Sequence, residues 1–120
     1  MELKINTGSK NYSILIGSNL LKDCNKIFNK KKITPNKALI VIDKNITLTS
    51  RKKLINNLKF KQKFIFYFQP SEKNKSLKTV DKIHKILFDK NFSRDDCIIS
   101  FGGGITGDVC GFASSTFKRG

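Results

Sequence analysis

The residues best suited to chemistry are the glycines near the end of the chain. The sequence holds eight glycines, and six of them fall within its closing segment, "ISFGGGITGDVCGFASSTFKRG". Gly102, Gly104 and Gly107 satisfy the pattern Gly-x-Gly-x-x-Gly, between an apolar run and a helical pattern. That context is typical of a loop that binds a diphosphate. We expect the glycines to let the backbone approach the phosphates and adopt positive φ. The helix that follows would offer them free N–H groups and its positive dipole end.

Two acidic residues accompany this loop. Asp43 ends an apolar run, "KALIVID". Because ligands of open α/β sheets bind beyond the carboxyl ends of the strands, we expect Asp43 and the glycine loop on one edge of the sheet. Asp43 could hydrogen-bond a ribose, or merely cap the segment that follows it. Asp108 comes directly after Gly107. A diphosphate would repel its carboxylate, so we place Asp108 beyond the phosphates.

The elements that must position these residues follow from the hydrophobic pattern. Three apolar runs without alternation, at 37–43, 64–68 and 97–101, predict strands buried on both faces. Helical patterns separate the runs, which indicates right-handed crossovers and a parallel sheet. "ELKIN" and "YSILIG" alternate around a glycine-containing turn and predict a hairpin. The expected fold class is therefore α/β, a Rossmann-like parallel sheet with flanking helices, preceded by an N-terminal β-hairpin.

Apolar positions at helical spacing predict the helices between the strands. They are Leu20, Leu21, Cys24 and Ile27, then Leu48, Leu54, Ile55 and Leu58, then Leu77, Val80, Ile83, Ile86 and Leu87. The helix after the glycine loop has a strip of small residues, Gly107, Gly111 and Ser115. It also has a mainly apolar strip, Ile105, Val109, Phe112 and Thr116. The small strip would allow close approach to the sheet, to a cofactor or to a second domain.

Length and composition narrow the function classes. A chain of 120 residues supports one domain with a real core. The net charge of +15 suggests nucleic-acid binding, but only three of the 24 basic residues are arginine, and we expect no nucleic-acid partner. No apolar run approaches the ~18 residues of a membrane span, and the N-terminus lacks a signal-peptide pattern, so a cytoplasmic protein without a membrane partner is expected.

The number and spacing of the cysteine and histidine residues do not indicate a metal site in this sequence. Cys24, Cys97 and Cys110 are far apart and lack a Cys-x-x-Cys pair, so buried free thiols are expected. His84 is the only histidine and lies in a helical pattern, where a structural or solvated role is the simpler interpretation. An ordinary catalytic zinc site needs about three protein ligands. We therefore assign no metal ligand among these residues.

From end to end, the sequence resembles the N-terminal domain of the 3-dehydroquinate synthase family. The opening hairpin, the strand ending at Asp43, "SEKNKSL" and "GGGITGDVCGFASSTFKRG" come in the order that this family shows. The last segment meets every fixed position of the family pattern. The resemblance implies that residues 1–120 are the NAD-binding domain, ending just after the glycine-loop helix. A helical C-terminal domain that binds the metal would be absent from this chain.

The resemblance also implies an activity of the shikimate pathway. A family member converts the sugar phosphate 3-deoxy-D-arabino-heptulosonate 7-phosphate to 3-dehydroquinate and releases phosphate. It uses NAD and a divalent metal, zinc or cobalt, and we expect a homodimer at full length. The alternatives are another sugar-phosphate cyclase, an NAD- and metal-dependent enzyme of the glycerol dehydrogenase type, or a nucleotide-binding module without catalysis. By themselves, the 120 residues are expected to catalyse nothing.

Site residues carry over from the family by motif. The implied cofactor-binding residues are Asp43, Ser71, Glu72, Lys75, Gly102, Gly103, Gly104, Ile105, Thr106, Gly107 and Asp108. Asp43 would contact the adenine-side ribose, and Asp108 would also act in catalysis near the nicotinamide ribose and the reacting sugar. Arg119 matches a substrate-binding arginine. Ser71 stands where the family has glycine, and without the resemblance Glu72 and Lys75 would be read as a solvated loop pair.

Overall fold

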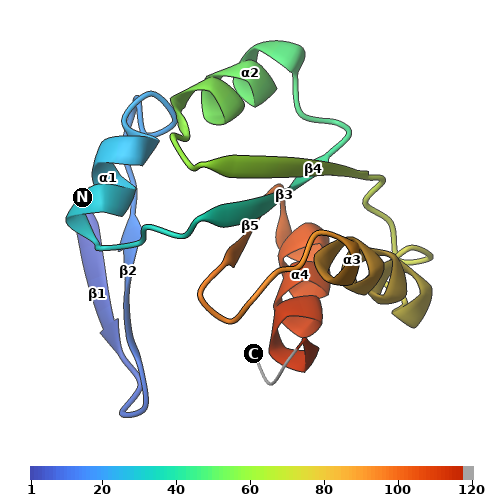
Figure 1. The fold of residues 1–120 in the computed structure, drawn as a ribbon. Helices are drawn as coiled ribbons and strands as arrows, with labels where there is room; N and C mark the ends of the chain where they lie inside the picture. Colours follow the sequence, from blue (N-terminus) through green and yellow to red (C-terminus); the bar gives the residue numbers. More distant parts are fainter. Residues whose placement is uncertain (118–120) are drawn as a thin grey trace.

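In the computed structural model, which describes residues 1–117, a three-stranded parallel sheet lies between helices (Figure 1). The strand order is β4-β3-β5, formed by β4 (Gln62–Phe68), β3 (Lys37–Asp43) and β5 (Cys97–Phe101). β3 pairs in parallel with both neighbours, so the predicted parallel sheet is confirmed. The predicted hairpin is also confirmed, as β1 (Glu2–Asn6) and β2 (Asn11–Leu15) pair antiparallel.

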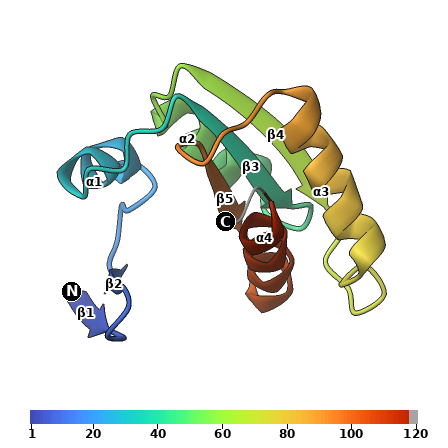
Figure 2. The same cartoon turned by 60° about the horizontal axis from the view of Figure 1, so that its bottom comes forward.

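Helices cover the two faces of the sheet. On one face, α3 (Leu77–Asp89) and α4 (Gly104–Thr116) bury a core around Leu39 and Val41. On the other face, α1 (Cys24–Lys30) and α2 (Leu48–Asn57) bury a smaller core around Ile40 and Ile42. Adjacent β3 residues point to opposite faces, so one strand supplies both cores. Figure 2 shows α3 and α4 side by side under the sheet, with the hairpin set apart near α1.

Only the central strand has both faces buried, so the prediction for the other two runs was wrong. Ala38 to Ile42 of β3 are fully buried. β4 is an edge strand, and its Ile65 and Tyr67 remain 38% and 45% exposed. α2 packs mainly over β3, which leaves this side of β4 partly uncovered. The unbroken apolar run of β4 therefore indicated a strand but not its burial.

Some predicted helix positions also differ. Leu20 and Leu21 lie in turns before α1, because Asn19 has a left-handed φ of 59° and the helix begins only at Cys24. Leu48 and Leu77 are exposed, because each is the first residue of its helix and extends past the core. The remaining apolar positions of α2 and α3 contribute to the two cores.

The hairpin turns its polar face toward α1. Register pairs Leu3 with Ile14 and Ile5 with Tyr12, so these four residues share one apolar face. On the other face, Lys31, the residue that follows α1, forms an ion pair with Glu2. This arrangement leaves the apolar face of the hairpin largely solvent-exposed.

Candidate functional site

The carboxyl ends of the strands bring Asp43 and the glycine loop together. Asp43 ends β3, and Gly102 follows the last residue of the neighbouring strand β5. A Cβ placed on Gly102 would lie 2.9 Å from the Cβ of Asp43 and 2.7 Å from Oγ1 of Thr106. Glycine is therefore required at 102 for close approach of two strand ends. The expected positive φ is wrong, because among the described residues the only glycine with positive φ is Gly8.

The helix after this loop begins with an open N-terminus. α4 starts at Gly104, and its N-cap residue Gly103 supplies no side-chain hydrogen bond. A Cβ on either residue would meet nothing within 4 Å. The first helical N–H groups have no partner within a helix, and they attract anions together with the helix dipole. The first turn also holds no acidic residue. The loop can thus accept a phosphate or diphosphate group.

Thr106 adds an unused hydrogen-bonding group beneath this loop. Its side chain is 1% exposed, and Oγ1 makes no hydrogen bond to the described part of the chain. Buried hydroxyl groups normally have a partner. Because Oγ1 is close to Gly102, the hydroxyl lies where a small shift of the loop, a water molecule or a bound group could satisfy it.

Asp43 already makes a local hydrogen bond. Its Oδ1 accepts from the backbone N–H of Asn45 at 2.7 Å, and its backbone carbonyl accepts from Ile46 N at 3.1 Å. This bond closes the turn after β3, whereas the cap of α2 is Thr47, whose side chain accepts from Ser50 N–H. The second carboxylate oxygen accepts no hydrogen bond from residues 1–117. Asp43 can therefore stabilise its turn and still accept a hydroxyl group.

A second cluster joins the 71–75 loop to α4. The loop is a helical turn in which Lys75 N–H donates to the Ser71 carbonyl at 3.0 Å, and Ser71 Oγ accepts from Asn74 N–H at 3.1 Å. This turn places Lys75 Nζ 3.0 Å from Oδ2 of Asp108. The hydrogen bond to Asp108 raises the pKa of Lys75, with a smaller contribution from Glu72.

The ion pair borders a hollow of about 370 Å³ between the N-terminal part of α3 and α4. Leu77 and Phe112, 70% and 49% exposed, also line this hollow. Lys75 and Asp108 are themselves largely exposed. The hollow therefore combines apolar walls with two opposite charges that remain accessible to a ligand.

The faces of α4 differ from the predicted ones. The small residues Gly107, Gly111 and Ser115 are exposed, so close packing on the sheet is the wrong alternative. Phe112 and Thr116 are exposed as well. The buried residues are Thr106, Val109, Cys110, Ala113 and Phe117. Ala113 and the other buried residues contact the core between the sheet and α3. Because α4 is rotated about its axis so that these residues face the core, Asp108 points to solvent.

The remaining predicted site residues make few contacts or lie outside the described residues. Gly107, like Gly103 and Gly104, has open space where a Cβ would stand. Ile105 is half-buried against the α3–α4 core. Glu72 is exposed in the same turn as Lys75 and makes no hydrogen bond through its side chain to the described residues. Arg119 lies outside the described residues.

His84 has the structural role that was expected. Its Nε2 lies 3.0 Å from the Ala113 carbonyl and 2.9 Å from Oγ1 of Thr116. It donates to the last turn of α4, where carbonyl groups lack intrahelical partners. Among residues 1–117, no three His, Cys, Asp or Glu side chains gather as a metal site would require.

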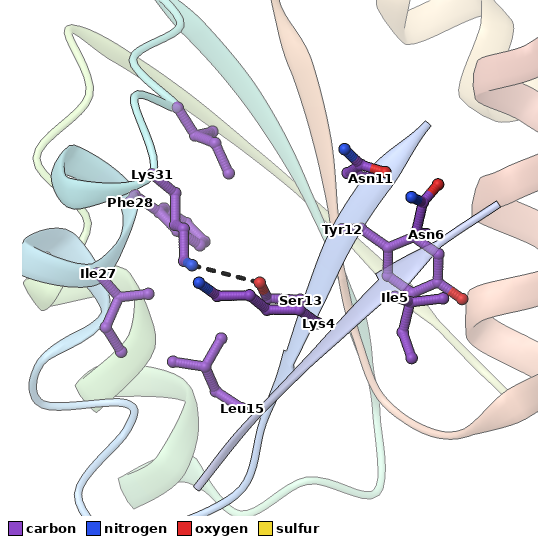
Figure 3. Close-up of a pocket in the computed structure, with 11 residues that line it drawn as sticks. Lys4, Ile5, Asn6, Asn11, Tyr12, Ser13, Leu15, Ile27, Phe28 and Lys31 are labelled. Carbon is purple, nitrogen blue, oxygen red and sulfur yellow. Dashed lines mark hydrogen bonds between the residues drawn. The ribbon is translucent and has the colours of Figure 1, made fainter. Parts of the chain in front are cut away.

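A hollow larger than the one beside α4 lies elsewhere in the described residues. It measures about 630 Å³ and lies between the hairpin and α1 (Figure 3). In Figure 3, Lys4, Ser13 and Leu15 point toward α1, and the bond from Lys31 to Ser13 spans the space. None of the predicted site residues that the structure describes lines it. In the described residues, no helix is long and apolar enough to span a membrane.

Arg51 lies next to the candidate site without any signal in a sequence motif. Its guanidinium contacts the loop after Asp43 and packs over Tyr67. No motif marks this residue, because its role depends on a turn, a helix and a strand that are separate in the sequence. A lone arginine eight residues after a site aspartate was the only available signal.

These features define a Rossmann-like α/β domain with a glycine loop and an open helix N-terminus at the carboxyl edge of its sheet. Solved structures with the same fold are those of 2-deoxy-scyllo-inosose synthase, one of them complexed with carbaglucose-6-phosphate, NAD+ and Co2+. Both align with a TM-score of 0.81 at 19% identity over all of this chain. The chain covers 32% and 34% of those chains.

Sequence comparisons give matches to one family along this chain. Residues 65–120 match the family described as 3-dehydroquinate synthase N-terminal. The chain is 53% identical over its full length to the 3-dehydroquinate synthase of Pelagibacter ubique, and 37% identical over 99% of its length to that of Clostridium botulinum. It spans about a third of these relatives, 33% and 34%. The matches confirm the resemblance to the N-terminal domain of the 3-dehydroquinate synthase family.

Proposed function

We infer that residues 1–120 form the NAD-binding domain of a 3-dehydroquinate synthase. The observation that carries this inference is the contact of Asp43 with Gly102 beside the open N-terminus of α4. It combines a ribose acceptor with a diphosphate loop on one sheet edge, as in dinucleotide-binding folds. The relatives that align along all or nearly all of the chain carry this enzyme name.

The residues present fit the cofactor. Gly102 leaves no space for a side chain, Gly103 and Gly104 leave the approach to α4 open, and the buried Thr106 hydroxyl lacks a partner in the described chain. We assign the diphosphate to residues 102–107 and the adenine-side ribose to Asp43. When bound, NAD would reversibly accept hydride from the C5 hydroxyl carbon of the sugar phosphate.

We assign Lys75 and Asp108 to the reacting end of the site. Their ion pair lies beside the hollow next to α4, one helical turn beyond the glycine loop. Asp108 would hold a hydroxyl of the nicotinamide ribose or the sugar, and Lys75 would keep its carboxylate charged and oriented. Glu72 and Ser71 would support the same loop, while Arg119 would bind the phosphate or carboxylate of the substrate.

The described residues do not fit a divalent metal, because they contain no cluster of ligands. We therefore assign zinc or cobalt to protein segments outside them and derive no step through it. In our proposal, the complete enzyme is a cytoplasmic homodimer that converts 3-deoxy-D-arabino-heptulosonate 7-phosphate to 3-dehydroquinate and phosphate. The 120 residues alone would bind NAD weakly and release no phosphate.

The test uses two proteins. One is the chain itself, and the other is a chimera in which it replaces the aligned third of the Pelagibacter ubique relative. Both receive NAD, zinc and the heptulosonate phosphate, and phosphate release is measured. We expect turnover by the chimera alone. A chimera with Asp108→Asn should fold and lose most turnover.

Two results would contradict the proposal. A folded chimera that binds NAD but releases no phosphate would show that this chain cannot serve the reaction. Turnover by the isolated chain above a no-protein control would show that the site is complete without further segments.

A further inference from the structure

Arg51 connects α2 to the loop that follows Asp43. It lies in the first turn of α2, where its backbone N–H donates to the Thr47 carbonyl at 3.0 Å. Its Nη2 donates to the backbone carbonyl of Lys44. Its Nε is buried and has no hydrogen-bond partner among residues 1–117. The side chain is therefore held within the protein rather than extended into solvent.

The carbonyl that Arg51 binds belongs to the peptide unit that orients Asp43. In this unit, the Lys44 carbonyl accepts from Arg51, and the Asn45 N–H donates to Oδ1 of Asp43 at 2.7 Å. A peptide unit is planar, so its carbonyl and N–H rotate together. If the peptide turned away from Arg51, the Asp43 carboxylate would lose its hydrogen bond.

An aromatic ring fixes the arginine side chain. The guanidinium carbon lies 5.2 Å from the ring centroid of Tyr67, in a cation–π arrangement. Tyr67 is paired in register with Ile42, one residue before Asp43. A planar guanidinium can stack on a ring and donate at its edge at the same time, whereas a lysine ammonium does not reproduce this geometry.

We propose that Arg51 is a positioning residue for the adenosine half of the dinucleotide. This rests on the proposed function, in which Asp43 receives the adenine-side ribose. Arg51 acts through the 44–45 peptide and does not itself touch the nucleotide. Its loss should weaken binding of the adenosine part and spare the glycine loop, which lies on β5 and α4.

Two probes separate these parts of the site. ADP carries an adenosine attached to a diphosphate, whereas inorganic diphosphate can engage only the glycine loop. We compare the dissociation constants of both probes in the full chain, in Arg51→Ala, in Arg51→Lys and in Asp43→Asn. Lys52→Ala is the matched control, because it removes one charge from an exposed position of the same helix.

We expect Arg51→Ala to raise the dissociation constant of ADP by about tenfold, the usual size for loss of a charge-assisted hydrogen bond. The dissociation constant of inorganic diphosphate should rise by less than about twofold, because for this probe the substitution mainly removes a surface charge. Arg51→Lys should have the same effect as Arg51→Ala. Asp43→Asn should likewise weaken ADP binding more than diphosphate binding. Lys52→Ala should produce no such difference between the two probes. Equal weakening of both probes in folded Arg51 variants, or no weakening, would overturn the proposal.

A readout without ligand keeps this inference separate from the proposed function. Hydrogen exchange of the Asn45 N–H reports its bond to Asp43. We expect exchange about tenfold faster in Arg51→Ala than in Lys52→Ala. Unchanged exchange would overturn the positioning role whether or not nucleotide binds. Faster exchange in a chain that binds neither probe would support the positioning of Asp43 and contradict the proposed function.

Discussion

Gly102 and Asp43 are so close that a Cβ on Gly102 would stand 2.9 Å from the Cβ of Asp43. The contact joins the ends of two neighbouring parallel strands, β5 and β3. It brings the glycine loop to a carboxylate that is 59 residues earlier in the sequence. The functional assignment depends on this approach, and it can be tested by glycine substitutions.

Gly102→Ala should destabilise the fold. The new Cβ would also lie 2.7 Å from Oγ1 of Thr106, and no flexible side-chain end can move away to relieve both contacts. We expect the free energy of unfolding to fall by about 1–3 kcal/mol, as in other overpacked sites. Urea denaturation followed by circular dichroism measures this change.

Gly103→Val, at the next position, should have the opposite effects: it should change stability little and weaken NAD binding strongly. A Cβ at 103 meets no atom within 4 Å, so the free energy of unfolding should change by no more than about 1 kcal/mol, the usual range for a poor N-cap residue. It would, however, occupy the path of a diphosphate, and NAD binding should weaken by more than about tenfold. Unchanged NAD affinity in folded Gly103→Val would contradict the loop assignment.

Asp108→Asn should lower the pKa of Lys75, because the hydrogen bond to Asp108 is the main cause of its upward shift. A raised lysine pKa stabilises the folded state below the unfolded value, and that contribution is lost as pH rises through the folded pKa. NMR titration of the lysine side chains measures the shift. Asp81→Asn, on the exposed side of α3, should leave the Lys75 pKa raised.

Acid should weaken the ion pair that joins Glu2 of the hairpin to Lys31. Hydrogen bonds from Lys31 and Ser13 lower the pKa of Glu2 from 4.5 to about 2. A lowered carboxyl pKa stabilises the fold above the unfolded value, and this contribution disappears as pH falls from 4.5 toward 2. Lys31→Met should raise the Glu2 pKa, and Lys4→Met should raise it less, as measured by NMR titration of the Glu2 carboxyl group. Equal effects would mean that the direct bond is unimportant.

His84→Ala should reduce stability without affecting nucleotide binding. The substitution removes the donor to the Ala113 carbonyl near the end of α4, at the opposite end from the helix start to which we assign the diphosphate. We expect a loss of about 1–2 kcal/mol in unfolding free energy, as for other hydrogen bonds between elements. Lys85→Ala, exposed on the same helix, is the control. A large loss of NAD affinity in folded His84→Ala would give this histidine a role in the site.

The sequence by itself determined the elements and the edge of the sheet that carries the site. Unbroken apolar runs mark the strands, and parallel topology directs Asp43 and the glycine loop to the same edge. These conclusions need only local periodicity and the direction of the strands. The role of Gly102 was less accessible, because the need for glycine there arises from Asp43 and Thr106 rather than from a positive φ.

Tertiary structure alone decided how each helix is rotated about its axis. That rotation buries Val109, exposes the small residues of α4 and brings Asp108 to Lys75. It also places Arg51 against the peptide that holds Asp43. The reason is physical: periodicity defines the faces of a helix, but the free energy of packing against distant elements selects the face that is buried.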